Sequence, residues 1–301
     1  MTNVQKNEIV KAIHKESKRL GSNNKVANHC DVSGAMISQM VKHNWEKIST
    51  GMWQKVAGKL HVNFSGWQIA QTSNFKMLFQ VFNDAKTEKL FIPVSNKAGS
   101  GKSAVANTFA DLYSDDAVYH IHAREWAKRE FIYNLMKLVG IDRPKGAITI
   151  DELGQKVIDF FEERSHLNPL LIINEADKLK APALRFLIPF SNALEDKVGL
   201  VLLGTENLKK EIKNGVRLNR KGYDEIDSRL GRNYITLIGA TKTDVQKICD
   251  INGIKDRTIQ NDIFKECNPI SKVVNKSQVT VVEDMRRVKR SIKRELLKAT
   301  V

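Results

Sequence analysis

Residues Asn96–Ser103 read Asn-Lys-Ala-Gly-Ser-Gly-Lys-Ser, and they directly follow the apolar run Leu90–Val94. Glycines placed between a strand and a helix let backbone N–H groups close around phosphate oxygens. Lys102 then reaches the β- and γ-phosphates, Ser103 offers a hydroxyl to Mg²⁺, and the new helix adds the positive end of its dipole. The stretch therefore predicts a site for ATP and Mg²⁺.

The first position of this loop departs from the usual pattern, because Asn96 stands where a glycine is expected. Asparagine tolerates positive φ better than most residues, so we expect the loop to close. A chance glycine-lysine loop is the alternative. The predicted cofactor-binding residues of the loop are Asn96, Lys97, Ala98, Gly99, Ser100, Gly101, Lys102, Ser103 and Ala104.

A second apolar run, Leu170–Ile173, ends in Asn174-Glu175-Ala176-Asp177. In P-loop ATPases this strand normally ends in an Asp that holds the Mg²⁺ shell and a Glu that acts as general base. Asn174 keeps a carbonyl acceptor but lacks the charge, which predicts weaker Mg²⁺ binding and slower hydrolysis. We expect Ser103 and Asn174 in the metal shell, and Glu175 and Lys102 as catalytic residues. A buried strand with a polar end is the alternative.

Other positions are candidates for contacts with the γ-phosphate. The run Gly199–Leu203 is followed by Thr205 and Asn207, either of which suits a phosphate sensor; a helix cap is the other interpretation. Arg229, or as a second choice Arg232, suits an arginine finger that reaches a neighbouring subunit. A surface ion pair is the alternative for the same residues.

Near the C-terminus, Arg286 begins a strongly basic helix, where it suits a nucleotide-sensing position. The same helix carries Lys289, Arg290, Lys293 and Arg294, so a solvated or DNA-facing basic face is the alternative.

From Leu90 onward, apolar runs alternate with helical patterns, which favours an α/β fold with a parallel sheet and helices on both faces. The expected strands are Leu90–Val94, Val118–Ile121, Leu170–Ile173, Gly199–Leu203 and Tyr234–Ile238. The expected helices between them are Ser103–Tyr113, Glu125–Val139, Ile150–Arg164 and Ala183–Leu194. After Gly239 we expect only helices, the last from Val282 to Ala299. The predicted domains are 1–65 (all-α), 66–89 (linker), 90–240 (core) and 241–301 (helical lid).

The segment Lys25–Lys42 has the spacing of a helix-turn-helix, in which the second helix enters the major groove. Ala27 is small where the helices cross, Asp31 takes the left-handed turn position, and Ser33 caps the second helix. Protein contacts are the alternative use of such a unit. The candidate DNA-binding residues are Ser33, Ser38, Gln39 and Lys42, of which only Gln39 can make a bidentate base contact, so we expect weak sequence preference.

The chain of 301 residues carries a formal net charge of +15, which indicates a polyanionic partner, first of all nucleic acid. Its three cysteines have neither metal-ligand spacing nor the number for a disulfide framework, so we expect no zinc site. We expect no membrane segment, and a soluble protein of the cytoplasm of a bacterial host cell.

In this order of motifs the chain resembles the phage Mu B family of transposition proteins, which are AAA+ ATPases related to TnsC-type regulators. The resemblance implies a P-loop AAA+ core with a parallel sheet and a helical lid, preceded by the helix-turn-helix domain. It also implies filaments of many copies on double-stranded target DNA, and activation of a DDE transposase. In such a filament the pore-lining phosphate contacts would be Arg124, Lys128, Arg129, Lys178, Lys180 and Arg185, with solvated helix ends as the alternative.

Two other functions are compatible with the same residues. One is a repressor-like regulator that binds ATP without turnover, because Asn174 lacks the metal-binding charge. The other is an ATPase that resembles a helicase loader.

Overall fold

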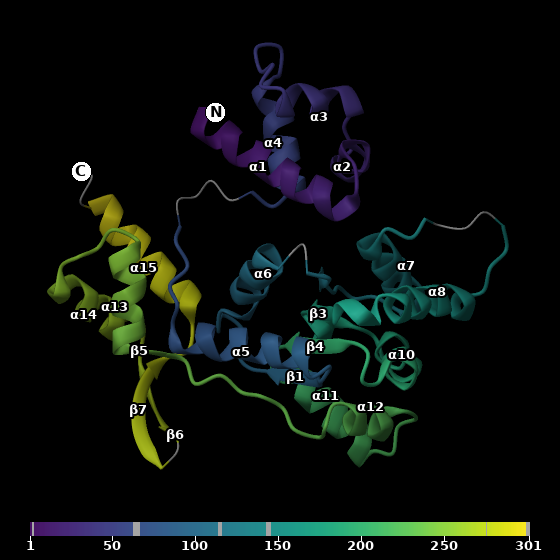
Figure 1. Ribbon diagram of the computed structural model, residues 1–301. Helices are drawn as coiled ribbons and strands as arrows, with labels where there is room; N and C mark the ends of the chain where they lie inside the picture. Colours follow the sequence, from purple (N-terminus) through teal and green to yellow (C-terminus); the bar gives the residue numbers. More distant parts are fainter. Residues whose placement is uncertain (2, 63–66, 114–115, 143–145, 275, 299–301) are drawn as a thin grey trace. The chain divides into compact units, whose positions relative to one another are not determined.

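The computed structural model describes residues 1, 3–62, 67–113, 116–142, 146–274 and 276–298, with the side chains of residues 3 and 4 outside the description. The chain divides into two compact units, Met1–Trp67 and Gln68–Val301. Each unit is described by itself below (Figure 1).

The first unit is a cluster of four helices around one apolar core. Its core contains Ile9, Ile13, Val26, Ile37 and Trp53, all fully buried. Serine side chains accept a backbone N–H at the start of three of the helices, which stabilises their first turns. The helices are α1 (Asn3–Leu20), α2 (Asn23–Cys30), α3 (Gly34–Val41) and α4 (Thr50–Lys59).

Helices α2 and α3 form the helix-turn-helix. Asp31 ends α2 in the left-handed conformation with φ of 54°, and Ser33 accepts a hydrogen bond from the Met36 backbone N–H at 3.2 Å. Ala27, at the crossing, is buried. The turn geometry expected for Asp31 and Ser33 is therefore present.

The second unit contains a parallel four-stranded sheet in the order β1-β4-β3-β2, which confirms the predicted α/β class. The strands are β1 (Phe91–Ser95), β2 (Val118–His122), β3 (Leu170–Asn174) and β4 (Gly199–Gly204). β3 and β4 are buried along their whole length because helices cover both faces.

Alternate strand residues belong to two separate apolar clusters, one on each side of the sheet. Leu170 and Ile172 pack with α5 (Ser73–Thr87) and α6 (Lys102–Leu112), whereas Leu171 and Ile173 pack on the other side. The helices of that second layer are α7 (Lys128–Val139), α8 (Ile150–Glu163), α9 (Ala181–Leu184), α10 (Leu187–Leu194), α11 (Glu206–Arg217) and α12 (Tyr223–Arg229), and two 3₁₀ turns lie at Ser165–Leu167 and Ala176–Lys178.

The fifth expected strand, Tyr234–Ile238, does not form. Ile235 makes only an isolated parallel bridge to Val94, with hydrogen bonds to the Pro93 carbonyl (2.9 Å) and from the Ser95 N–H (3.0 Å). Pro93 has no N–H for the next rung on one side. On the other side, the Leu237 N–H donates to the Asn96 side chain instead of to the strand.

The C-terminal part contains strands, so the expectation of helices alone after Gly239 was wrong. β5 (Ala240–Thr241), β6 (Ile270–Val274) and β7 (Ser277–Val282) form an antiparallel sheet in the order β5-β7-β6. Three helices accompany it: α13 (Lys242–Ile251), α14 (Arg257–Glu266) and α15 (Met285–Lys298).

Among the described residues, none of the helices combines the length and the apolar character needed to span a lipid bilayer.

Candidate nucleotide site

The loop between β1 and α6 has the backbone geometry of a phosphate-binding loop. Gly99 and Gly101 have φ of 83° and 91°, values that strongly favour glycine. Asn96 is not among the described residues with positive φ, so the reason expected for its tolerance was wrong. Instead, its side-chain oxygen accepts the Leu237 N–H at 3.2 Å and ties the loop to the neighbouring segment.

The Lys102 side chain is folded back into this loop. Its Nζ donates to the Asn96 carbonyl (2.8 Å), the Lys97 carbonyl (3.1 Å) and Ser100 Oγ (3.0 Å). Burial lowers the pKa of the Lys102 ammonium to about 8, while the charge of Asp177 opposes this shift and that of Arg286 adds to it. A buried cation held only by neutral oxygens gains most from an anionic ligand, which suits the phosphate-binding role of this lysine.

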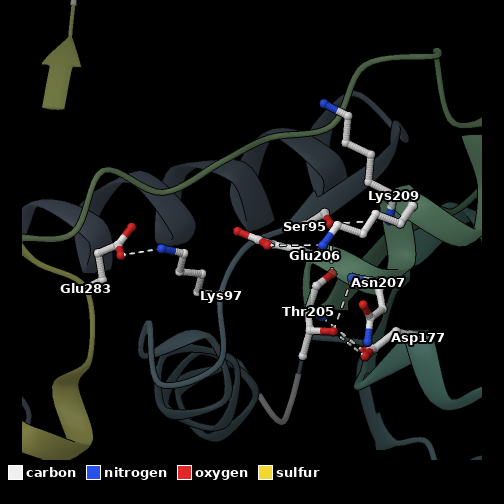
Figure 2. Close-up of polar contacts among 9 residues, drawn as sticks. Ser95, Lys97, Asp177, Thr205, Glu206, Asn207, Lys209 and Glu283 are labelled. Carbon is white, nitrogen blue, oxygen red and sulfur yellow. Dashed lines mark hydrogen bonds and ion pairs between the residues drawn. The ribbon is translucent and has the colours of Figure 1, made fainter.

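The start of α15 is attached to the same loop. The Met285 N–H donates to the Gly99 carbonyl at 2.8 Å, and a Cβ on Gly99 would lie 2.3 Å from Asp284 Oδ1. Glu283 receives Lys97 Nζ at 2.7 Å, as Figure 2 shows, and Lys272 Nζ at 2.7 Å. The structure therefore brings the α15 terminus to the phosphate loop, as the assignment of Arg286 to a nucleotide-sensing position requires.

The residues expected around Mg²⁺ lie together where α6 meets the ends of β2 and β3. Asn174 Nδ2 donates to Ser103 Oγ at 2.8 Å and to His122 Nδ1 at 2.9 Å, and Asn174 is only 1% exposed. Its main-chain carbonyl accepts the Ala123 N–H at 2.8 Å, whereas within the described part of the chain its side-chain oxygen Oδ1 accepts no hydrogen bond. The amide nitrogen therefore faces the Ser103 hydroxyl, and a half-turn of the amide would place an oxygen there, which is the type of ligand that Mg²⁺ prefers.

Glu175 follows Asn174 directly and has a strained backbone. Its φ and ψ are 57° and 36°, in the left-handed region that residues with side chains rarely adopt. Its carboxylate pairs with Lys178 Nζ at 2.8 Å, with both side chains 43% exposed. Because such an exposed pair is weak, the carboxylate can exchange Lys178 for a water molecule.

Thr205 is joined to the end of β3 through Asp177, which sequence reasoning had not singled out. Asp177 accepts the Thr205 hydroxyl at 2.6 Å and its N–H at 3.1 Å, while Ser95 Oγ donates to the Thr205 carbonyl at 2.8 Å (Figure 2). Thr205 also caps α11 by accepting the Asn207 N–H. Of the two sensor candidates, Thr205 is held in place by Asp177 and Ser95. Asn207 is exposed, and its backbone N–H donates to the Thr205 hydroxyl.

The two arginine candidates have different surroundings. Arg232 pairs with Asp224 (2.8 Å) and approaches the buried Asp227 (3.5 Å), so it belongs to a local ion-pair network. Among the residues that the structure describes, the acidic partner of Arg229 is Glu195, at 3.6 Å. Glu195 lies just before β4, at the amino end of the parallel strands, whereas the phosphate loop follows the carboxyl end of β1. Arg229 therefore lies away from its own loop, as a residue acting on a neighbouring copy would.

Some of the candidate phosphate contacts of the second unit are already paired. Lys128 binds Asp151 and Lys178 binds Glu175, while Arg129 lies over the Tyr133 ring. The exposed members of this group are Arg124, Arg129, Lys180 and Arg185.

In the first unit, the candidates of α3 lie at the surface. Ser33, Gln39 and Lys42 are exposed and Ser38 is half-buried.

Comparisons with known proteins identify the sheet region. Residues 85–212 match a family described as an AAA domain, and this segment contains all four parallel strands and the phosphate loop. No curated protein matches the chain. Twelve chains of solved structures match. One is the crystal structure of Cdc6p from Pyrobaculum aerophilum, with 17% identity, coverage of 63% of this chain and 53% of that chain, and a TM-score of 0.48. This chain thus spans about half the length of that protein.

The segment 85–212 is therefore similar to an AAA domain, and its parallel sheet with the phosphate loop has the P-loop AAA+ fold. The matched segment includes neither α15 nor the N-terminal unit.

Proposed function

We propose that this protein is an AAA+ ATPase that binds double-stranded DNA with little sequence preference, assembles on it as a filament of many copies, and delivers it to a DDE transposase. The observation that carries the proposal is the joint between the phosphate loop and α15, because it gives the bound triphosphate two contact surfaces. The helix-turn-helix and the net charge of +15 support the DNA partner. The expected location is the cytoplasm of a bacterial host cell.

Nucleotide binding would use the groups already aimed at the loop. The glycine backbone and the α6 terminus surround the phosphates, and Lys102 exchanges its carbonyl partners for phosphate oxygens. Arg286 adds a second cation from the α15 side. Mg²⁺, when bound, would neutralise phosphate charge beside Ser103 and Asn174.

Hydrolysis would use Glu175 to orient and deprotonate the attacking water, with Thr205 fixed nearby by Asp177. Arg229 of one copy would stabilise the charge that develops at the nucleotide of the next. Because Asn174 lacks a negative charge, we expect slow hydrolysis that DNA and the transposase stimulate.

The test is assembly on random duplex DNA with a non-hydrolysable ATP analogue, imaged by electron microscopy, together with steady-state hydrolysis with and without DNA. Filaments that need the nucleotide, and turnover that rises with DNA, support the proposal. A chain that stays monomeric and ignores plasmid DNA at saturating analogue contradicts it.

A second function is favoured by one observation, the neutral Asn174 at the metal position. A regulator that binds ATP without turnover would use the helix-turn-helix to bind specific sites. Sequence-specific DNA binding with no hydrolysis, in the same two assays, would select this alternative.

A further inference from the structure

One side of α15 carries a row of positive side chains. Arg286, Arg290 and Lys293 are exposed and follow one another at spacings of four and three residues, which places them on the same side of a helix. Val288 and Ile292, on the opposite side, are fully buried. The packing of α15 therefore fixes which side of the helix presents this cationic row.

The cationic row has no ion-pair partner in the part of the chain that the structure describes. Two acids beside α15 pair with cations outside the row. Glu266 pairs with Arg294, and Glu295 pairs with Lys298 at 2.7 Å. Asp284, just before the helix, accepts a backbone N–H of its first turn at 2.9 Å. The charge of the row is therefore available to an anion from outside the chain.

The cations of the row also repel one another. Arg286 and Arg290 are neighbours on the helix surface, as are Arg290 and Lys293, and like charges at these spacings destabilise a helix. Lys289 lies beside the row, where burial and the charge of Lys293 lower the pKa of its ammonium group. Because bound negative charge relieves this repulsion, the face gains most from a polyanion.

The spacing and the residue types of the row fit phosphates better than base edges. Arg290 and Lys293 are separated by about 4.5 Å along the helix axis. One strand of B-DNA presents a phosphate about every 3.4 Å along its own axis, so the two side chains can reach neighbouring phosphates. Guanidinium groups bind phosphate oxygens through two hydrogen bonds at once. The row contains no amide side chain for bidentate contact with adenine, which favours binding without sequence preference.

We propose that α15 binds the phosphate backbone of duplex DNA through Arg290 and Lys293, the part of the cationic row that lies beyond Arg286. This inference rests on the proposed DNA-binding function and adds a contact surface to it. Arg286 remains with the nucleotide site at the first turn, where the Met285 N–H donates to the Gly99 carbonyl. One helix then carries a nucleotide contact at its start and DNA contacts in its next two turns.

Two double variants of the full chain separate position from net charge. Arg290→Gln/Lys293→Gln removes two charges from the row. Arg287→Gln/Arg294→Gln is the matched control, because it removes two charges from the side of the same helix that contacts Glu266. A charge-preserving variant, Arg290→Lys/Lys293→Arg, completes the set.

The measurement is fluorescence anisotropy of a labelled random-sequence duplex at a saturating non-hydrolysable ATP analogue, between about 50 and 200 mM salt. We expect the row variant to bind about tenfold more weakly, and its slope of log affinity against log salt to be smaller by about 2, since two phosphate contacts are lost. The control and charge-preserving variants should stay within about threefold of the original affinity and keep its slope. Circular dichroism checks that all variants are folded.

An unchanged slope and affinity in the row variant would overturn the inference and leave an acidic protein surface as the partner of this face. An equal loss in the matched control would also overturn it, because the effect would then follow net charge and not position. Absence of DNA binding by the original chain at the lowest salt would contradict the proposed function itself, on which the inference rests.

Discussion

The ends of β1 and β3 lie at the same edge of the sheet, but they differ in the chemical groups that they provide for a nucleotide. At the end of β1, Lys102 has three oxygen partners and the loop is joined to α15 through Gly99. At the end of β3, Asn174 supplies an uncharged ligand and Glu175 pairs with Lys178. The first end holds groups suited to phosphate, whereas at the second end Glu175 must release Lys178 before it can bind an attacking water molecule.

This difference indicates that nucleotide binding and nucleotide hydrolysis depend on the ends of two different strands. Substitutions at the β1 end should change affinity and assembly. Substitutions at the β3 end should change turnover with affinity largely intact. Each prediction below tests that separation, beginning with the largest expected effect.

Lys102→Ala should abolish nucleotide-dependent filament formation and weaken nucleotide binding by about a thousandfold, because two charge-assisted bonds to phosphate are lost. Fluorescent-nucleotide titration and electron microscopy measure the two effects. Lys76→Ala is the control, since Lys76 is an exposed lysine of α5 outside the loop. Wild-type assembly by Lys102→Ala would refute the assigned site.

Glu175→Gln should lower turnover by about a hundredfold, because the amide cannot accept the proton of the attacking water. Nucleotide affinity should change by less than about threefold, which a binding titration checks beside the steady-state assay. A parallel loss of affinity would break the separation between the two strand ends.

Nucleotide affinity should fall as pH rises above 8. The pKa of Lys102 is lowered to about 8 in the free protein, and bound phosphate favours its charged form. Below pH 8 the ammonium is already charged, so affinity is flat; above it, binding must take up a proton. From pH 7 to pH 9 we expect a loss of about tenfold, together with proton uptake in calorimetry at pH 9. A pH-independent affinity would show that Lys102 does not carry the main contact.

Asn174→Asp should raise turnover about threefold by restoring negative charge to the Mg²⁺ shell. Steady-state hydrolysis with saturating DNA is the measurement, and Asn207→Asp, at the exposed sensor candidate, is a control for added charge. Flat or reduced turnover would mean that the β3 end is not limited by the missing charge.

The parts of the fold that sequence could predict are those set by contiguous residues. The four parallel strands and the loop Asn96–Ser103 follow from local apolar runs and glycine spacing, and the structure places them within a residue or two of expectation. The strand at Tyr234–Ile238 failed because Pro93, far away in sequence, removes the N–H that its next rung needs. The β6–β7 hairpin was missed although Val273–Val274 and Val279–Val282 flank a short link, which is a usable signal.

The candidate site divides in the same way. Lys102, Ser103, Asn174 and Glu175 were identified from motifs, and the structure brings them to one edge of the sheet. The contacts of His122 and Asp177 were missed because the first comes from strand adjacency and the second joins Thr205, 28 residues further along the chain. Two pointers were present in the sequence: a histidine at a strand end, and an acid three residues beyond Asn174.

The hydrogen bond from the Met285 N–H to the Gly99 carbonyl couples the start of α15 to the phosphate loop. The helix is held at its start by this hydrogen bond and by the Lys97–Glu283 pair, is buried at Val288 and Ile292, and continues to Lys298. At 1.5 Å per residue, Lys298 lies about 20 Å from Met285 along the helix axis. A tilt of the helix by about 6° about Met285 would therefore move Lys298 by about 2 Å. A small shift of the Gly99 carbonyl that tilts α15 would thus produce a larger shift at the C-terminal end of this helix.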